Sequence, residues 1–405
     1  MSVYAQNLLA QLVKAGHDIV MISQYRDDAA GRGVYGGGPP PAVPGVRVVG
    51  LESRGEAIVG HGEPADFERD IAEMVDTAIA HHNEAPFDLV HAQYGYPCGL
   101  AALEISRRTG IPNVVSIQGG DGHWVGTCCD SHKRGIRAVL EHANELLIGS
   151  ASFAGEVHDN HATPAERFTI VPGAVDTTRF YPVAGRRAGA LADPPVFLYH
   201  GRVDRRKGVL EMIEAVDRLR DGPAFTVLVS GIGPDLDAAR EAVAERDLGG
   251  RVVFTGYVDY DDVPEVYRRA DVFLSPTWSE GFSNTILEAM ASGLAVISTR
   301  SVGVVDCLEH EHNGLLIEPH DVAGLAAAMQ RVLEDHALRQ RLVETALADV
   351  ETQYRWPVVA AQIEARYEAI KHTAPDNAWT ALYPPETTRA DADMDCRFRT
   401  APHLL

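Results

Sequence analysis

Helical periodicity and short apolar runs alternate along the first half of the chain. The pattern predicts helices near residues 3–15, 66–82 and 100–108 and strands at 18–22, 89–92, 113–117 and 146–148. Strands and helices that alternate in this way are typical of an α/β domain with a parallel, doubly wound sheet. The first half therefore predicts one such domain.

A second alternating domain follows a linker near residues 172–182. Its first strand is predicted at 196–200, and a later β-rich run at 271–275 ends at Pro276 and leads into a helix that continues to residue 291. A last helix is predicted over 356–372, after which the sequence is rich in Pro, Thr and Asp. We expect domains at 1–180 and 181–352, a helical segment at 353–372 and a tail or surface wrap at 373–405.

Two glutamates, Glu280 and Glu288, lie on either side of a predicted helix start. Glu288 follows Asn284 by four residues, so these two side chains share one helical face. The first helical turn has unpaired backbone N–H groups and a dipole that favours anions, which suits a diphosphate. The short polar side chains of residues 283–285 add donors there. A carboxylate accepts two hydrogen bonds at once, which suits neighbouring sugar hydroxyls.

Two basic residues, Arg202 and Lys207, follow the strand at 196–200. Ligands of open α/β sheets bind beyond the carboxyl ends of the strands, where positive charge stabilises a leaving diphosphate. A solvated charged loop has the same composition, and glutamates near a helix start are common. The combination of four charged groups at strand ends and helix starts of one domain favours a site for a nucleotide diphosphate sugar.

Six motifs between residues 196 and 329 resemble the C-terminal half of retaining glycosyltransferases of family four. They are GR…KG at 201–208, SGIGP at 230–234, VFTGY at 253–257, ADVFLSP at 270–276, EGF…EAMASG at 280–293 and NGLL at 313–316. The resemblance implies a GT-B fold, with two doubly wound Rossmann-like domains that face each other across a cleft. It also implies that the helix at 353–372 crosses back to the first domain.

The resemblance also implies the roles of individual residues. Arg202 and Lys207 would bind the diphosphate, Glu288 the ribose and Glu280 the donor sugar, while the turn at 256–258 would lie beside the base. The implied donor-binding residues are Gly201, Arg202, Lys207, Tyr257, Val258, Glu280, Gly281, Phe282, Ser283, Asn284, Thr285 and Glu288.

The mechanism implied by the resemblance is a retaining transfer without a metal. The acceptor hydroxyl attacks the anomeric carbon from the face that the diphosphate leaves, and a phosphate oxygen takes its proton. The expected donor is a UDP- or GDP-sugar, and we expect no further cofactor. Glycans, lipid-linked sugars and small molecules remain open as acceptors, and polysaccharide biosynthesis is the expected setting.

The acceptor-side candidates lie in the first half, beyond strands at 89–92 and 113–117. They are His91, Gln118, Gly119, Asp121 and His123. Family members usually have His or Arg where Gln118 stands, followed by Gly and then Asp, so Gly119 and Asp121 match and Gln118 does not. Glutamine keeps a polar contact to the donor sugar but cannot supply a protonated group, and His123 is the candidate that could supply one. For His91 and His123 a purely structural role is the alternative.

The beginning of the chain differs from the family pattern. The chain opens directly on the helix at 3–15, whereas family members usually begin with a β-strand and a Gly-Gly loop. We therefore expect the first strand of the N-terminal domain to be missing, which would expose the edge of the neighbouring strand. The hypothesis is that Met1 is an internal methionine of a longer chain; a family member without this strand is the alternative.

A cluster of histidines and cysteines and two Asp-x-Asp runs could bind a metal, but other interpretations explain them better. The possible zinc ligands are His123, Cys128, Cys129 and His132, whose spacing fits no standard zinc module. Asp-x-Asp runs occur at 259–261 and 391–393, and residues 259–262 are better explained as the cap of a helix that starts near Val263. We therefore predict no metal.

Composition excludes several classes of partner. The 405 residues suit two domains, and the net charge of −21 argues against nucleic acid and against a broad grip on anionic lipids. No apolar run is long enough to cross a membrane, no secretory leader is recognisable, and five cysteines without disulfide-like spacing favour a reduced compartment. We expect a cytoplasmic protein, with peripheral contact at the inner face of the membrane left open.

Other functions remain as alternatives. A nicotinamide dehydrogenase would need a third glycine in the run at 230–236, which the chain lacks. A sugar phosphorylase or nucleotide-sugar epimerase would share the fold and the diphosphate site. A truncated protein that binds nucleotide sugar without transferring it is the non-enzymatic alternative.

Overall fold

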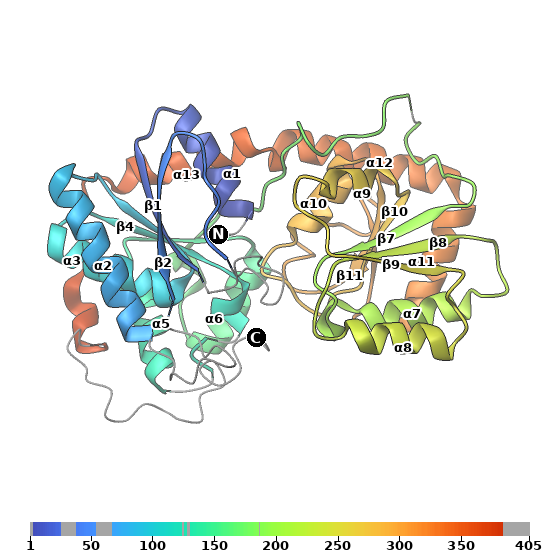
Figure 1. The fold of residues 1–405 in the computed structure, drawn as a ribbon, viewed down its shortest axis with the longest axis horizontal. Coiled ribbons are helices and arrows are strands. Elements are labelled where there is room, and N and C mark those ends of the chain that lie inside the picture. The colour runs from blue at the N-terminus through green and yellow to red at the C-terminus, as the bar shows by residue number, and fades with distance from the viewer. Residues whose placement is uncertain are drawn as a thin grey trace. The chain divides into compact units, whose positions relative to one another are not determined.

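The computed structural model describes residues 3–25, 38–53, 67–123, 125–127, 130–185 and 187–383 of the chain. Internal contacts divide the chain into two compact units (Figure 1). Unit 1 comprises Met1–Pro172 with Ala360–Leu405, and unit 2 comprises Gly173–Val359. Each unit is described by itself below.

Unit 1 contains two parallel sheets within its described residues. Its strands are β1 (Ile19–Tyr25), β2 (Val46–Glu52), β3 (Val90–Gln93), β4 (Asn113–Ile117), β5 (Glu145–Ile148) and β6 (Phe168–Ile170). One sheet has the order β1-β2 and the other the order β3-β4-β5-β6. Its helices are α1 (Val3–Lys14), α2 (Phe67–Glu84), α3 (Leu100–Thr109), α4 (Gly119–His123), α5 (Asp130–His142) and α6 (Ala151–His161), with shorter turns η1 (Gly95–Gly99), η2 (Ala165–Arg167) and η5 (Asn377–Ala381).

Sequence signals account for these elements. Every residue of β4 and β5 is buried, as expected for central parallel strands covered on both faces. Helix α3 ends at Gly110, whose φ of 80° gives the left-handed C-terminal cap. Helix α6 begins after Ser150, whose side chain accepts a hydrogen bond from the Phe153 N–H.

Unit 2 contains a single sheet of parallel strands in the order β12-β11-β10-β7-β8-β9. The strands are β7 (Val196–His200), β8 (Thr226–Ser230), β9 (Val252–Gly256), β10 (Val272–Ser275), β11 (Ala295–Thr299) and β12 (Leu315–Ile317). The helices are α7 (Val209–Arg218), α8 (Leu236–Glu245), α9 (Val263–Arg268), α10 (Asn284–Ala291), α11 (Val322–Glu334) and α12 (His336–Asp349), with turns η3 (Arg205–Lys207) and η4 (Val350–Tyr354).

The sheet of unit 2 has helices on both faces, with α7 and α8 on one side and α9 and α10 on the other (Figure 1). Successive residues of a strand point to opposite faces. Accordingly, Phe197 packs in one apolar cluster, with residues of α7, α8 and α11, while Leu198 packs in another with residues of α9 and α10. The core of unit 2 therefore consists of two layers, which hold the strand ends and helix starts rigidly in place.

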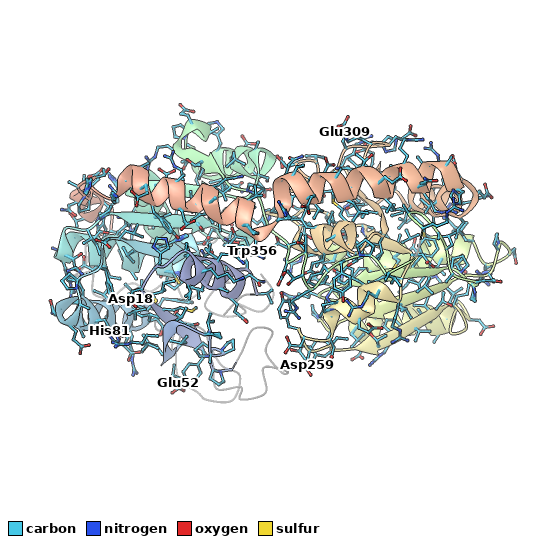
Figure 2. All side chains as sticks on the ribbon, turned by 90° about the horizontal axis from the view of Figure 1, so that it is seen from above. Asp18, Glu52, His81, Asp259, Glu309 and Trp356 are labelled. Atoms are coloured by element: carbon cyan, nitrogen blue, oxygen red, sulfur yellow. The ribbon has the colours of Figure 1, made fainter. Side chains whose placement is uncertain are left out.

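Helix α13 (Trp356–Ile370), with Trp356 labelled in Figure 2, begins in unit 2 and ends in unit 1. Its C-terminal part is tied to unit 1 by polar contacts. Arg366 binds both oxygens of Glu145 at 2.8 and 2.9 Å, and the hydroxyl of Tyr367 lies 2.6 Å from Nδ1 of His91. These contacts attach the helix to strands β5 and β3.

Most predicted elements are confirmed, but strands β2 and β6 and helices α5 and α6 of unit 1 were not predicted. Strand β2 was missed because its seven residues alternate irregularly between partial burial and exposure and contain a glycine. Helix α10 begins at Asn284, so residues 281–283 are loop and not the first helical turn. Residues 377–381 form η5 against α5 with Trp379 only 2% exposed, so this part of the expected tail is packed. Residues 384–405 lie outside the described residues.

The prediction of a missing first strand stays a prediction. The predicted helix near Val263 is confirmed as α9, with Asp262 at its N-cap position, but no side-chain capping bond forms there. Asp259, in the loop before α9, is labelled in Figure 2. In the described part of the chain, no helix is both long and apolar enough to cross a membrane.

Candidate functional site

The candidate donor site lies where the strand order of unit 2 reverses. From β7 the chain crosses to β8 on one side, and the later strand β10 lies on the other side of β7. In open α/β sheets such a reversal leaves a crevice beyond the carboxyl ends of the two strands, where ligands bind. The loops that follow β7 and β10 carry Arg202, Lys207 and Glu280, and Glu288 lies in the helix α10 that comes next.

The loop after β7 holds its basic residues with neighbouring carboxylates. Asp204 accepts a hydrogen bond from the Arg206 N–H at 2.9 Å and pairs with the Arg206 guanidinium at 2.8 Å. Burial alone would raise the pKa of Asp204, but the bonds from Arg206 outweigh it and hold the pKa below its ordinary value. Arg205 is bound in the same way by Asp235, at 2.6 Å. Both arginines are therefore committed to the protein.

Arg202 and Lys207 remain as the basic residues that can face a ligand. The guanidinium of Arg202 lies 3.4 Å from Asp204, a longer contact than that of Arg206. Nζ of Lys207 lies 2.7 Å from Oε1 of Glu280, and their side chains are 34% and 19% exposed. The fold thus joins a residue that follows β7 to one that follows β10, as a site built on both loops requires.

Close backbone packing fixes this ion pair. Gly208, directly after Lys207, has φ of +72°, and a Cβ there would lie 2.0 Å from the carbonyl oxygen of Pro276. Gly303, with φ of +75°, packs equally closely on the carbonyl of Glu280. Side chains at these two glycines would push the loops of Lys207 and Glu280 out of position.

The start of α10 presents polar groups beside Glu280. Ser283 occupies the N-cap position without a capping bond, and its hydroxyl lies 3.2 Å from that of Thr285. Oδ1 of Asn284 is buried and has no hydrogen-bond partner among the described residues. Phe282 differs from its neighbours, because its ring packs against the apolar cluster under α10. Residues 283–285 therefore leave the first turn of α10 polar, and Phe282 anchors the loop.

Glu288 lies one turn further along α10 in a largely apolar setting. Its Oε2 accepts a hydrogen bond of 2.8 Å from the hydroxyl of Tyr267, which is fully buried. Burial raises the pKa of Glu288 to about 7, against the opposing effects of the Tyr267 hydroxyl and the positive charge of Arg179. Glu288 therefore titrates near neutral pH, and no bond to its other carboxylate oxygen is found among the described residues.

Sequence reasoning missed a polar pair beside Tyr267, the hydrogen-bond partner of Glu288. His200 and Ser230 end β7 and β8 in register, and Nδ1 of the histidine lies 3.0 Å from the serine hydroxyl. The ring of His200 lies 5.4 Å from that of Tyr267, and burial lowers the pKa of His200 to about 4, so the imidazole is neutral. The signal that could have revealed the pair is its place directly before Gly201 and Gly231.

The turn expected beside the base lies at the end of β9. Gly256 has φ of +76°, and the next residue, Tyr257, is 51% exposed, an unusual exposure for a large aromatic side chain. Val258 packs against the apolar cluster of α9 and α10. Tyr257 is therefore available to a ligand, while Val258 fixes the turn.

In unit 1, Asp121 holds a loop together. Its carboxylate accepts hydrogen bonds from the backbone N–H groups of Gly95 at 2.7 Å, Gln118 at 3.0 Å and Tyr96 at 3.2 Å. Burial raises the pKa of Asp121 to about 6 although these three donors oppose it. Asp121 lies in the short helix α4, which begins at Gly119. Its three bonds join the loop after β4 to the turn after β3.

The two histidine candidates of unit 1 have protein partners. Nδ1 of His123 lies 2.5 Å from Oε1 of Glu156 on α6, and its ring packs on Phe153 with centroids 4.9 Å apart. His91 contacts Tyr367 and Ser116, and burial lowers its pKa to about 4. His91 is therefore neutral and fixed in position.

Zinc binding gains no support from the described residues, among which no group of three His, Cys, Asp or Glu side chains is arranged to hold a metal. His132 packs with Phe67 and Tyr96. Cys128, Cys129 and the Asp-x-Asp run at 391–393 lie outside the described residues.

Family models match both halves of the chain. Residues 186–349 match the model described as glycosyl transferases group 1, and residues 1–174 match the model described as a glycosyl transferase 4-like domain. The two matches together extend over most of the sequence and meet close to the division between the two units.

Curated relatives and solved structures agree with these matches. The chain is 28% identical over 290 residues to a glycogen synthase of Mycobacterium tuberculosis, covering 70% of this chain and 69% of the relative. It is 25% identical over 395 residues to a D-inositol 3-phosphate glycosyltransferase of Pseudarthrobacter chlorophenolicus, covering 91% and 90%. The crystal structure of Anabaena Alr3699/HepE in complex with UDP and glucose has a TM-score of 0.68 with 17% identity, covering 87% and 99%.

Proposed function

Since the chain belongs to the group 1 glycosyltransferases and has their GT-B fold, we propose that it is a retaining enzyme that moves a sugar from a nucleotide diphosphate to a hydroxyl acceptor. Arg202 and Lys207 bind the diphosphate, Glu280 the transferred sugar and Glu288 the ribose. The reaction needs no metal ion, because Lys207, Arg202 and the N-terminus of α10 neutralise the leaving group.

One observation carries this proposal. The contact of 2.7 Å between Lys207 and Glu280 joins the loops after β7 and β10 at the point where the strand order reverses. An anion-binding and a hydroxyl-binding side chain therefore lie side by side where an α/β sheet binds its ligands. A diphosphate that carries a sugar presents the matching groups side by side: phosphate oxygens for the lysine and hydroxyls for the carboxylate.

The ion pair also indicates what happens on binding. Without ligand, Glu280 neutralises Lys207. When the diphosphate approaches, Lys207 exchanges the carboxylate for phosphate oxygens, and Glu280 becomes available to the sugar hydroxyls. In the transfer step the bond from the anomeric carbon to the diphosphate oxygen breaks, and the acceptor oxygen forms its bond on the same face. The acceptor proton passes to the departing phosphate, whose charge Lys207 and Arg202 stabilise.

The relatives support a nucleotide sugar as donor but differ in acceptor. The Anabaena structure contains UDP and glucose, while the curated relatives are named for glycogen and for D-inositol 3-phosphate. We propose UDP- or GDP-sugar as donor and a sugar, polyol or glycan hydroxyl as acceptor. The free thiols of Cys98, which is half-buried, and Cys307, which is buried, are compatible with a reducing compartment, and we propose the cytoplasm.

A thermal-shift panel tests the donor site. The intact protein is heated with UDP, GDP, ADP and their sugar conjugates, beside Glu288→Ala and the exposed control Glu309→Ala (Figure 2). A ligand at a hundred times its dissociation constant should stabilise the protein by about 2.7 kcal/mol, which is a shift of several degrees. We expect one nucleotide to stabilise the wild type and the Glu309 variant but not the Glu288 variant.

Transfer is then measured with the stabilising donor and with glycogen or D-inositol 3-phosphate as acceptor. Formation of the glycosylated acceptor with the anomeric configuration of the donor supports the full proposal. Nucleotide binding without transfer to any acceptor would favour the non-enzymatic alternative. Release of epimerised sugar nucleotide, or turnover of inorganic phosphate, would favour an epimerase or a phosphorylase.

A further inference from the structure

Strands β3 and β4 carry a line of polar side chains on one face of the sheet. His91 and Gln93 alternate with Val90 and Ala92 along β3, so the first two share a face. On the opposite face, Val90 packs against apolar residues of α3. Because Gln93 pairs in register with Ser116, the polar residues of the two strands are neighbours.

Hydrogen bonds join these side chains into one continuous chain. The hydroxyl of Tyr367 lies 2.6 Å from Nδ1 of His91, and Nε2 of His91 lies 2.8 Å from the Ser116 hydroxyl. Nε2 of Gln93 lies 3.3 Å from the same histidine nitrogen. The chain ends at Gln118, whose Nε2 donates to Oε1 of Gln93 at 3.4 Å.

Stability alone does not explain this arrangement. Polar groups taken out of water cost free energy unless they are bonded, and apolar side chains would join α13 to the sheet without that requirement. The other face of β3, packed on α3, is apolar. The polar line is also continuous up to the carboxyl edge of the sheet, where ligands of parallel sheets bind.

The direction of the last bond determines what Gln118 presents. One of the two N–H groups of its amide donates to Gln93 and the other remains as a donor, while no bond to its amide oxygen is found among the described residues. The amide oxygen can only accept a hydrogen bond. A ligand hydroxyl is the matching donor, whereas a phosphate, which lacks donors when ionised, is not.

We propose that Tyr367, His91 and Gln93 are positioning residues that orient Gln118 so that its amide oxygen accepts a hydrogen bond from a hydroxyl of the acceptor substrate. The proposal rests on the proposed glycosyltransferase function and deepens it, because it assigns the acceptor a sugar or polyol hydroxyl at the carboxyl edge of β3 and β4. It also gives α13 a role in unit 1 beyond packing.

The kinetic test is a double-mutant cycle in the full-length protein. Transfer from the stabilising donor to D-inositol 3-phosphate is measured for Gln118→Leu, Tyr367→Phe and the double variant. Each single change should raise the acceptor KM about three- to tenfold, the range for one lost hydrogen bond, with the donor Kd unchanged. The double variant should match Gln118→Leu alone, because Tyr367 acts only through Gln118. Multiplied effects in the double variant would overturn the proposal.

Tyr354→Phe is the matched control, since Tyr354 is 6% exposed against 7% for Tyr367 and, among the described residues, its hydroxyl bonds to a backbone carbonyl, that of Asp306. It should leave the acceptor KM unchanged. Gln93→Leu, which breaks the chain one step from Gln118, provides a second variant in case Tyr367→Phe is poorly folded.

A second measurement is independent of transfer. In protein labelled with 15N in the glutamine side chains, the Gln118 amide signal is assigned by its loss in Gln118→Leu. It should shift in Tyr367→Phe and Gln93→Leu and stay in place in Tyr354→Phe. An unmoved Gln118 signal would overturn the proposal that Tyr367, His91 and Gln93 orient Gln118, even if transfer proceeds. A moved signal without any transfer or nucleotide binding would leave the relay standing and reject the proposed function.

Discussion

Glu288 gives the sharpest test of the donor site, because its protonation should control nucleotide affinity. Burial raises its pKa from 4.5 to about 7 in the ligand-free protein. A carboxylate accepts hydrogen bonds from both ribose hydroxyls, whereas the protonated acid has one oxygen that is also a donor. The ionised fraction is about nine-tenths at pH 8 and about one-tenth at pH 6, so affinity should fall about tenfold between them.

The assay is calorimetric titration at pH 6, 7 and 8 of the nucleotide that stabilises the protein. Glu288→Gln is the necessary control, because it keeps the shape and the Tyr267 bond but cannot ionise. Titration of the nucleotide's own phosphate affects both proteins equally. The ratio of the two Kd values should therefore change about tenfold, with wild type favoured at pH 8. A ratio that does not vary with pH would refute the assignment of Glu288.

The raised pKa of Glu288 also predicts how the stability of the protein depends on pH. Stability should fall as pH rises, whereas nucleotide affinity should rise. The folded protein holds the Glu288 proton more tightly than the unfolded chain does, so this contribution to stability is full below pH 4.5 and is lost as pH rises through about 7. At pH 8 the ionised, poorly solvated carboxylate should cost up to about 3 kcal/mol. Glu288→Gln should thus be more stable than wild type at pH 8 while binding nucleotide less well.

Three further predictions concern the loops after β7 and β10. Lys207→Ala should lower kcat about 10²–10³-fold, measured by steady-state transfer, because it removes charge stabilisation from the leaving diphosphate; unchanged turnover would exclude Lys207. Glu280→Gln should bind the free nucleotide diphosphate more tightly, since Lys207 loses its competing partner, and the sugar conjugate no more tightly than the free diphosphate; calorimetry with both ligands decides, and a uniform loss would contradict the exchange. Gly208→Ala should lower the free energy of unfolding by about 1–2 kcal/mol or more, owing to its positive φ and the carbonyl of Pro276; Gly249→Ala, with open space around it, should stay near wild type in the same urea titration.

The fold was predictable because it depends on local patterns, and the candidate donor site was proposed from the same patterns. Strand β4 was expected at 113–117 and is found there, since a short apolar run followed by glycine is a strong signal. The proximity of the charged residues after β7 and β10 could be predicted from the sequence, because parallel strands place their carboxyl ends at one edge of the sheet. Their direct contact at 2.7 Å required the structure.

The settings of the site residues were not predictable from local patterns. The partner of Glu288 is Tyr267, 21 positions away on another helix, and that of His123 is Glu156, 33 positions away. Such pairings depend on tertiary packing, which the hydrophobic periodicity of a sequence does not reveal. The same holds for Asp121, whose carboxylate was expected to serve the acceptor and instead binds three backbone N–H groups. Sequence indicated which residues are chemically suitable, and packing determines which of them are free.

Glu280 and Glu288 are held in opposite ways before a ligand binds. Glu280 is stabilised as an anion by Lys207, so it gains a new partner only when a diphosphate takes the lysine. Among the described residues no cation is in direct contact with Glu288, and burial holds it near the midpoint of its titration at neutral pH. Ribose hydroxyls can therefore draw it into the charged form at little cost. Because the first exchange needs the diphosphate and the second the ribose, a sugar phosphate without its nucleoside satisfies only one of them. With the proposed roles of Glu280 and Glu288, selectivity for the complete nucleotide sugar would follow from how each carboxylate is held before the ligand arrives.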